Sequence, residues 1–131
     1  MKAKIILMGI LSWMGSLCSC SAQSADFRSL TADEFEAAIA DTSIVRLDVR
    51  TVEEYSEGHI AHTLNIDVLK DDFEAKAMEQ LPKGKTLAVY CRGGNRSKKA
   101  AQILVKNGFE VIELDTGYKG WTAANKPVTK E

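Results

Sequence analysis

The chain has 131 residues, which is enough for one domain and too few for two. Hydrophobic residues make up 45% of it, charged residues make up 27%, and the formal net charge is −1. This balance argues against a nucleic-acid-binding protein, which usually presents a strongly basic face. It leaves the class of small-molecule substrate open, and the chain contains no internal repeat.

The N-terminus has the order of a secretory signal peptide. Basic residues at Lys2 and Lys4 are followed by an almost uncharged apolar run over residues 5–17 and then by small residues. The apolar run is too short to cross a membrane core of about 30 Å, which needs roughly 20 residues. The sequence therefore predicts an exported, periplasmic protein. The alternative is an N-terminal segment that is disordered or that forms a helix of the folded core.

The end of this signal resembles a bacterial lipobox. Residues 17–20 read Leu-Cys-Ser-Cys, which puts Leu at −3 and makes Cys20 the lipidated first residue of the mature protein. The cysteine at −2, Cys18, is less usual there, and a rival signal ends after Ser24. We favour a signal over residues 1–20, so that the protein contacts the membrane only through its lipid anchor.

The three cysteines point to one reactive thiol. If Cys18 leaves with the signal and Cys20 carries lipid, Cys91 is the only free thiol. An unpaired cysteine in an exported domain indicates a reactive group. Cys18 and Cys20 have the spacing of half a metal site. No second half exists among one other cysteine and two histidines, so we predict no metal.

Residues 21–30 are polar and small, and we expect them to form a tether ahead of a domain over residues 31–128. In this domain, short apolar runs of strand type alternate with segments of helical period. The predicted strands cover residues 43–49, 86–90 and 110–114. The first predicted helix begins at Thr31, and the others cover residues 51–56, 71–80, 97–107 and 118–124.

Local signals mark several ends of these helices. Thr31 and Glu34 have the spacing of a capping box, and so do Thr51 and Glu54. Gly108 follows the fourth helix at the position where glycine commonly ends one.

Strands that alternate with helices predict an α/β domain with a mainly parallel sheet covered on both faces. In such sheets the reactive groups lie at the carboxyl ends of the strands. Two of these ends carry polar or nucleophilic residues. One is Asp48-Val49-Arg50, and the other is Cys91-Arg92.

The second of these ends has the composition of a nucleophile loop. Cys91 follows the strand over residues 86–90 and supplies a sulfur that reacts as the thiolate. Gly93 and Gly94 permit positive φ angles, which can turn backbone N–H groups inward to form an anion site. The helix that begins at Ser97 adds its own unsatisfied N–H groups.

The charges around this loop favour an anion on the sulfur. Arg92 and Arg96 add permanently charged, forked donors, and the helix dipole has its positive end here. We therefore predict a lowered pKa for Cys91 and no need for a general base. A single cysteine at a strand end is more often a buried apolar residue, but the combination of thiol, glycines and arginines favours a nucleophile.

At these residues the sequence resembles the rhodanese family, in particular its single-domain members, over roughly residues 30–128. The loop that matches the family's active-site motif is Cys91, Arg92, Gly93, Gly94, Asn95, Arg96 and Ser97. The upstream motif is matched by Asp48-Val49-Arg50, Glu54-Tyr55, Gly58-His59-Ile60 and Asn65-Ile66. The downstream motif is matched by Leu114, Gly117 and Trp121.

The resemblance implies a three-layer α/β fold with a central, mainly parallel sheet of about five short strands. It implies that Cys91 is the catalytic residue and that residues 92–97 form the loop that binds the anionic substrate. It also implies that Asp48, Arg50 and His59 are architectural rather than catalytic. No metal or organic cofactor is expected, and we expect a monomer.

The function implied is sulfur transfer. Cys91 would take sulfane sulfur from an anionic donor such as thiosulfate and pass the persulfide sulfur to cyanide, a thiol or a protein acceptor. One alternative is a non-catalytic sulfur carrier or regulatory module. Another is an enzyme that acts on an oxyanion such as arsenate or phosphate on the same fold. Against a phosphatase, only four residues separate Cys91 from Arg96, where phosphatases with a cysteine nucleophile have five.

The sequence departs from the family at two places. His62-Thr63 stands where Gly-Ala is common, and Thr116-Gly117 stands where Gly-Gly is common. We expect His62 to be a surface residue; the alternative is a side chain that lines the pocket.

Overall fold

Five short parallel strands form one sheet, in the order β1-β5-β4-β2-β3. The computed structural model describes residues 26–131. The strands are β1 (Arg28–Leu30), β2 (Val45–Asp48), β3 (Thr63–Asn65), β4 (Thr86–Tyr90) and β5 (Glu110–Leu114). The helices are α1 (Ala32–Ile39), α2 (Val52–Glu57), α3 (Phe73–Gln80), α4 (Asn95–Lys106) and α5 (Gly117–Ala123).

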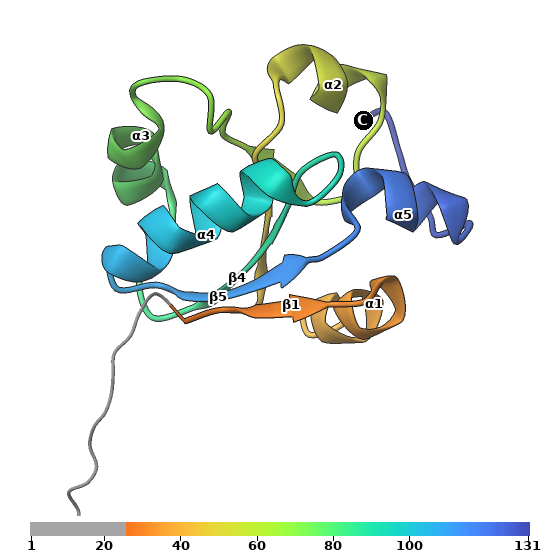
Figure 1. Cartoon of the computed structure of the whole chain (residues 1–131), viewed down its shortest axis with the longest axis horizontal. Helices are drawn as coiled ribbons and strands as arrows, with labels where there is room; N and C mark the ends of the chain where they lie inside the picture. Colours follow the sequence, from red (N-terminus) through yellow and green to blue (C-terminus); the bar gives the residue numbers. More distant parts are fainter. Residues whose placement is uncertain (1–25) are drawn as a thin grey trace, which may run out of the picture.

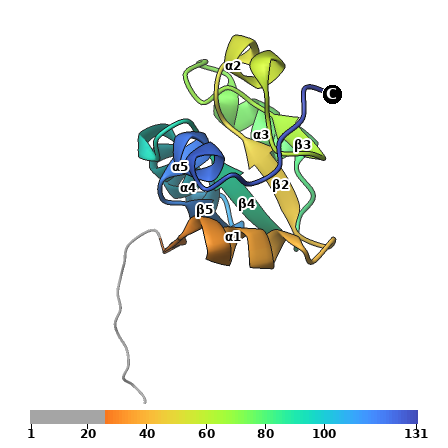
Figure 2. The same ribbon diagram turned by 90° about the vertical axis from the view of Figure 1, so that its right-hand side faces the viewer.

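Helices cover both faces of the sheet, and alternate side chains of β4 pack against helices on opposite faces. The β4 side chains at Leu87 and Val89 join a core with α3 and α4. Those at Ala88 and Tyr90 join a core with α1 and with Trp121 of α5. A central strand that is buried on both faces reads as a continuous apolar run. The three-layer α/β fold predicted from the sequence is confirmed (Figures 1 and 2).

Three segments lie at the carboxyl ends of the strands: the loop between β4 and α4, helix α2 and helix α5 (Figure 1). The two helices flank the loop. Backbone N–H groups at the start of α5 donate to the carbonyls of Cys91 and Arg92, over N–O distances of 2.7 and 2.9 Å. The fold therefore holds the predicted nucleophile loop between two helices.

Both predicted capping boxes are present. The Thr31 hydroxyl accepts from the Glu34 N–H, while the Glu34 carboxylate accepts from the Thr31 N–H. The same pair of bonds joins Thr51 and Glu54 at the start of α2. These signals depend on residues three positions apart, so the sequence alone specifies them.

Helix α4 begins at Asn95, two residues ahead of the predicted Ser97. Gly94 is its N-cap in a left-handed conformation, with φ of 106°, which lets the chain turn directly from the loop into the helix. The other end is as predicted, because Gly108 lies just beyond the C-cap with φ of 91°.

The tether prediction for residues 21–30 is wrong at its C-terminal end. Arg28–Leu30 form β1, which pairs in parallel with β5 at the edge of the sheet. Of these three residues only Leu30 is buried, so the sequence contains no apolar run that would predict this strand. The predicted signal over residues 1–20 and the predicted lipidation of Cys20 concern residues outside those that the structure describes.

Within residues 26–131, no helix has the length and apolar character that a membrane span requires.

Candidate active site

Cys91 lies directly after β4, at the carboxyl end of the strand. Its side chain is buried, with 1% of the residue exposed, and it forms no disulfide. The backbone N–H of Gly94 donates to Sγ over 3.0 Å. The thiol of Cys91 lies 3.5 Å from the Ser97 hydroxyl, within reach of a sulfur hydrogen bond. The loop therefore turns backbone and side-chain hydrogen-bonding groups toward the sulfur.

Gly94 has no room for a side chain. A Cβ at this position would lie 2.1 Å from the carbonyl oxygen of Asp115, and its φ of 106° already disfavours other residues. Gly93 differs, because its φ is not positive and nothing lies within 4 Å of the Cβ position. The expectation that both glycines adopt a positive φ is correct for Gly94 and wrong for Gly93.

Gly117 fixes the other side of the loop. A Cβ there would lie 2.3 Å from the carbonyl oxygen of Arg92, and φ is 68°. This close approach lets the first N–H groups of α5 reach the loop carbonyls. Glycine at position 117 is therefore required by the backbone contact.

The two arginines of the loop have different surroundings. Both terminal nitrogens of Arg96 donate to the carboxylate of Glu54, over 2.7 and 3.0 Å. These hydrogen bonds lower the pKa of Glu54 to about 2, against the opposing effect of burial. Arg92 is exposed. The charge of Arg96 is thus partly compensated, and Arg92 is the loop arginine that faces solvent.

Arg92 borders a cavity of about 370 Å³ next to the loop. Positive and negative side chains both line it, so it is polar rather than uniformly cationic. The lining residues are Arg50, Glu54, Glu57, Gly58, Arg92, Tyr118, Lys119 and Thr122. Such a cavity suits a small polar or charged ligand.

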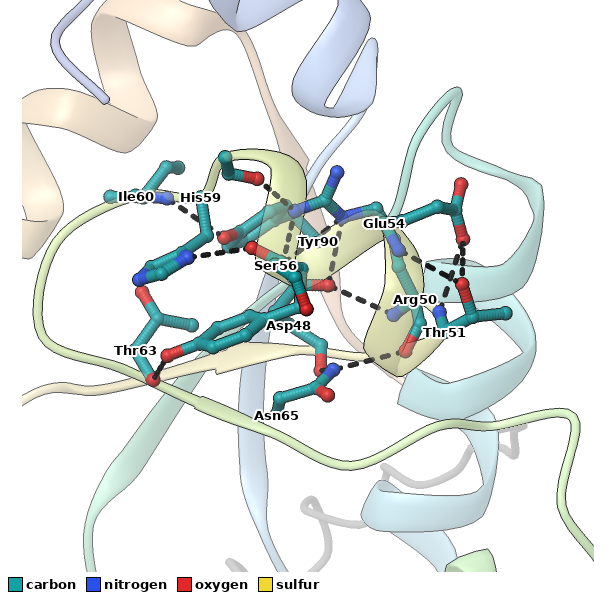
Figure 3. A network of polar contacts seen from close by, with 12 residues as sticks. Asp48, Arg50, Thr51, Glu54, Ser56, His59, Ile60, Thr63, Asn65 and Tyr90 are labelled. Atoms are coloured by element: carbon teal, nitrogen blue, oxygen red, sulfur yellow. Dashed lines mark hydrogen bonds and ion pairs between the residues drawn. The ribbon is translucent and has the colours of Figure 1, made fainter. Parts of the chain in front are cut away.

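Asp48 and Arg50 of the upstream motif form a buried ion pair (Figure 3), and Arg50 also lines this cavity. Asp48 is fully buried, and Arg50 donates to its carboxylate through Nε at 3.0 Å and through a terminal nitrogen at 2.6 Å. Arg50 also donates to the Gly58 carbonyl at 2.7 Å. The Asn65 amide spans the carbonyls of Asp48 and Arg50, at 3.0 Å each. This network ties β2 and β3 to the end of α2.

Aromatic rings enclose the same network. His59 stacks on Tyr55 with ring centroids 3.7 Å apart, and its Nδ1 lies 2.8 Å from the Tyr55 carbonyl. The Arg50 guanidinium lies 4.2 Å from the ring centre of Tyr118. Burial, followed by the charge of Asp48, raises the pKa of Tyr90, which keeps its phenol neutral. Asp48, Arg50 and His59 are buried, and the hydrogen bonds described for their side chains join them to one another, to Gly58 and to Tyr55.

His62 is exposed, with φ of 60°, and borders a surface hollow with Val45 and Leu64. It does not line the cavity beside Arg92. The expectation of a surface residue is therefore confirmed.

One buried charge was missed by the sequence reading. Glu113 of β5 is fully buried, and its carboxylate accepts from the Ser97 hydroxyl over 2.6 Å. Ser29 and Lys98 also donate to it. A glutamate inside an otherwise apolar strand is the signal that could have found it. Among the described residues, no three histidine, cysteine or carboxylate side chains gather as a metal site.

Comparison with known proteins identifies the family. The family model described as "Rhodanese-like domain" matches residues 31–124. The chain therefore belongs to the rhodanese-like family.

Two curated relatives carry sulfurtransferase names. The chain is 40% identical over 82 residues to "Thiosulfate sulfurtransferase GlpE" of Coxiella burnetii, covering 61% of this chain and 73% of that protein. It is 34% identical over 88 residues to "Putative sulfurtransferase YtwF" of Bacillus subtilis, covering 67% and 82%. It also matches a tRNA uridine(34) hydroxylase of Staphylococcus epidermidis at 38% identity over 83 residues. That match covers 60% of this chain and spans only 26% of the hydroxylase.

Solved structures agree with the family assignment. A rhodanese-related protein from Thermoplasma volcanium superposes with a TM-score of 0.67 at 30% identity, covering 79% of this chain and 99% of the other. The rhodanese-like domain of Alr3790 from Anabaena superposes with a TM-score of 0.70 at 26% identity, covering 79% of each chain.

Proposed function

We propose that this protein is a sulfurtransferase that carries sulfane sulfur on Cys91 as a persulfide. The observation that carries the proposal is the position of the Cys91 sulfur. It lies at the carboxyl end of β4 and 3.0 Å from the backbone N–H of Gly94. The relatives named as sulfurtransferases support the same class of reaction.

The first step is an exchange at sulfur. The Cys91 thiolate attacks the outer sulfur of thiosulfate, a new S–S bond forms to Cys91, and the S–S bond of thiosulfate breaks. Sulfite leaves with the electron pair of that bond, so no external oxidant is needed. The Gly94 N–H then donates to the anionic persulfide, as an oxyanion-type donor does.

The second step returns the thiolate. Cyanide, a small thiolate or a thiolate on a protein acceptor attacks the terminal sulfur, and Cys91 leaves as the thiolate. Thiol–disulfide exchange follows the same course. Two covalent steps replace one direct transfer between donor and acceptor.

We assign the binding of an anionic donor to the loop over residues 92–97. Arg92 faces solvent beside the 370 Å³ cavity and attracts the donor. Arg96 is held by Glu54 and positions the loop, with part of its charge left to act on the site. Gly93 and Asn95 are exposed and form the rim that an acceptor approaches.

A sulfur carrier is the second candidate. The chain is 36% identical over 84 residues to "Putative sulfur carrier protein YrkF" of Bacillus subtilis, which covers 63% of this chain and 44% of that protein. The buried Cys91 suits either role, because it shields a persulfide from bulk solvent.

The deciding experiment measures sulfur uptake and transfer with the wild-type protein beside Cys91→Ser. Intact mass is recorded before and after thiosulfate, and turnover is followed with cyanide and with a small thiol. We expect the wild type alone to gain one sulfur atom and to turn over with both acceptors. Uptake without transfer to small acceptors supports the carrier. A Cys91 that no sulfane donor modifies overturns both, and arsenate and phosphate are then the substrates to test.

We also propose that the protein is exported and anchored through lipid on Cys20. Expression of the full chain with a radiolabelled fatty acid tests this, with Cys20→Ala as the matched variant. Label on the wild type alone is the expected result. A mature protein without label that begins after Ser24 overturns the anchor and leaves export intact.

A further inference from the structure

Glu113 is a fully buried acid that the proposed reaction does not use. Its carboxylate accepts from three groups on two elements, β1 and α4. These are the Ser29 hydroxyl of β1, the Ser97 hydroxyl at 2.6 Å and the Lys98 ammonium at 3.2 Å. All three of these neighbours carry hydrogens that they can donate to the carboxylate. Glu113 thus acts as an acceptor toward Ser97.

Ser97 has one hydroxyl proton and three acceptors within reach. Its Oγ lies 2.6 Å from Glu113, 3.1 Å from the Gly94 carbonyl and 3.5 Å from the Cys91 sulfur. A contact of 2.6 Å between a hydroxyl and a carboxylate oxygen requires the proton between them. At rest, the Ser97 proton therefore points to Glu113 and not to the sulfur.

We propose that Glu113 is a positioning residue for Cys91, acting through the orientation of the Ser97 hydroxyl. With its proton held by Glu113, Ser97 offers a lone pair to Cys91 and accepts from the thiol. It cannot at the same time donate to a thiolate. Glu113 thereby restrains the resting reactivity of the sulfur, and the Gly94 N–H is left as the donor to its anionic form. This inference rests on the proposed function for Cys91 as the nucleophile.

Other charges around the sulfur must be held constant in any test. Arg92 and Arg96 lie on the same loop and helix, and Glu54 compensates Arg96. Lys98 bonds both Glu113 and the exposed Asp115. Burial lowers the pKa of Lys98, but the hydrogen bonds to these two acids outweigh it and raise the pKa overall, so Lys98 stays charged.

Two substitutions at Glu113 separate orientation from charge. Glu113→Met removes both the charge and the acceptor, and an apolar residue in place of a buried ion is often tolerated. Glu113→Gln removes the charge but keeps an amide oxygen that can accept from Ser97. The readouts are the rate at which iodoacetamide alkylates Cys91 at neutral pH and the ultraviolet absorbance of its thiolate, with Cys91→Ser as blank. Neither depends on sulfur transfer.

We expect Glu113→Met to alkylate about two- to tenfold faster than the wild type, the effect of one freed hydrogen bond. Glu113→Gln should change the rate less. In a Ser97→Ala background the effect of Glu113→Met should vanish. Ser29→Ala is the matched control, since it removes a different hydroxyl from the same carboxylate and should leave the rate unchanged.

Equal effects of the two Glu113 variants, persisting without Ser97, overturn the proposal in favour of a long-range charge effect. An alkylation rate in Glu113→Met equal to that of the wild type also overturns the proposal and leaves Glu113 a structural role only. If Glu113→Met does not fold, the alkylation rate of Ser97→Ala alone tests the proposal. A hydroxyl that only accepts from the thiol predicts a rate equal to or above the wild type, and a slower rate contradicts the inference. Failure of sulfur transfer with these alkylation results intact would count only against the proposed function.

Discussion

The Arg96 guanidinium and the Glu54 carboxylate form a two-pronged ion pair that joins the start of α4 to the start of α2. The two residues are 42 positions apart in the chain. Glu54 also accepts from the backbone N–H of Thr51 in the capping box. One carboxylate therefore caps a helix and positions the loop arginine.

This relationship predicts a pH-dependent contribution to stability. The pKa of Glu54 falls from its ordinary 4.5 to about 2 in the folded protein, mainly through its hydrogen bond with Arg96. A lowered pKa stabilises the fold fully above about pH 4.5, and this contribution is lost as the pH falls through about 2. Glu54→Gln should therefore cost about 1–2 kcal/mol at neutral pH, a value that allows for partial solvent exposure.

Urea unfolding at a series of pH values checks this prediction. The difference between wild type and Glu54→Gln should shrink between pH 4.5 and pH 2, the span of the shift. Glu53→Gln, on the exposed side of the same helix, is the control and should match the wild type throughout. A difference for Glu54→Gln that does not vary with pH would contradict the assignment.

The buried pair of Asp48 and Arg50 predicts a larger and purely structural effect. Asp48→Asn would leave the Arg50 guanidinium, which is 3% exposed, without the carboxylate that pairs with it. Removing one partner of a buried ion pair typically costs about 3–5 kcal/mol. We expect a loss of this size in the free energy of unfolding, measured by chemical denaturation.

An exposed ion pair supplies the control for Asp48. Asp72, the N-cap residue of α3, and Lys76 lie 3.6 Å apart, with about half of each side chain exposed. Asp72→Asn should change stability by less than about 0.5 kcal/mol. Similar losses for Asp48→Asn and Asp72→Asn would show that the buried pair has no special role.

Much of the fold was predictable because its signals are local. The capping boxes at Thr31 and Thr51 each depend on one residue three positions later. The apolar run of β4 is buried on both faces, so its sequence alone marks a central strand. The Cys91 loop was readable because the thiol, the glycines and the helix start are neighbours in the chain.

The contacts that the sequence did not reveal are distant in the chain or weak in pattern. The ion pair between Arg96 and Glu54 joins two helices that are distant in the chain, so no pattern in the sequence indicated that the two loop arginines would differ. Strand β1 has only Leu30 buried and carries no apolar period. Glu113 stood in a strand read as apolar, and its partner Ser97 comes from another element.

The loop backbone predicts that Gly94 tolerates no side chain. Gly94→Ala would place a Cβ against the Asp115 carbonyl at a positive φ, and the combined strain should cost about 2–4 kcal/mol. Relief of the clash moves the N–H that reaches Cys91. We therefore expect the folded variant to transfer sulfur more slowly than the wild type, in addition to its loss of stability. Gly93→Ala, which meets open space, should keep the free energy of unfolding within about 0.5 kcal/mol. Equal losses of stability in the two variants would refute the distinction.

The exposure of Arg92 predicts a role in binding the donor rather than in the chemistry. Arg92→Gln should raise KM for thiosulfate by about threefold to tenfold, the effect of one lost contact to a charged group, with a smaller change in kcat. Because the attraction is electrostatic and exposed, the difference from wild type should narrow as salt is added. Lys106→Gln removes a positive charge from the far end of α4 and should leave KM unchanged. Steady-state kinetics at two ionic strengths check this prediction. A fall in kcat at constant KM would instead show that Arg92 stabilises the transition state of the reaction.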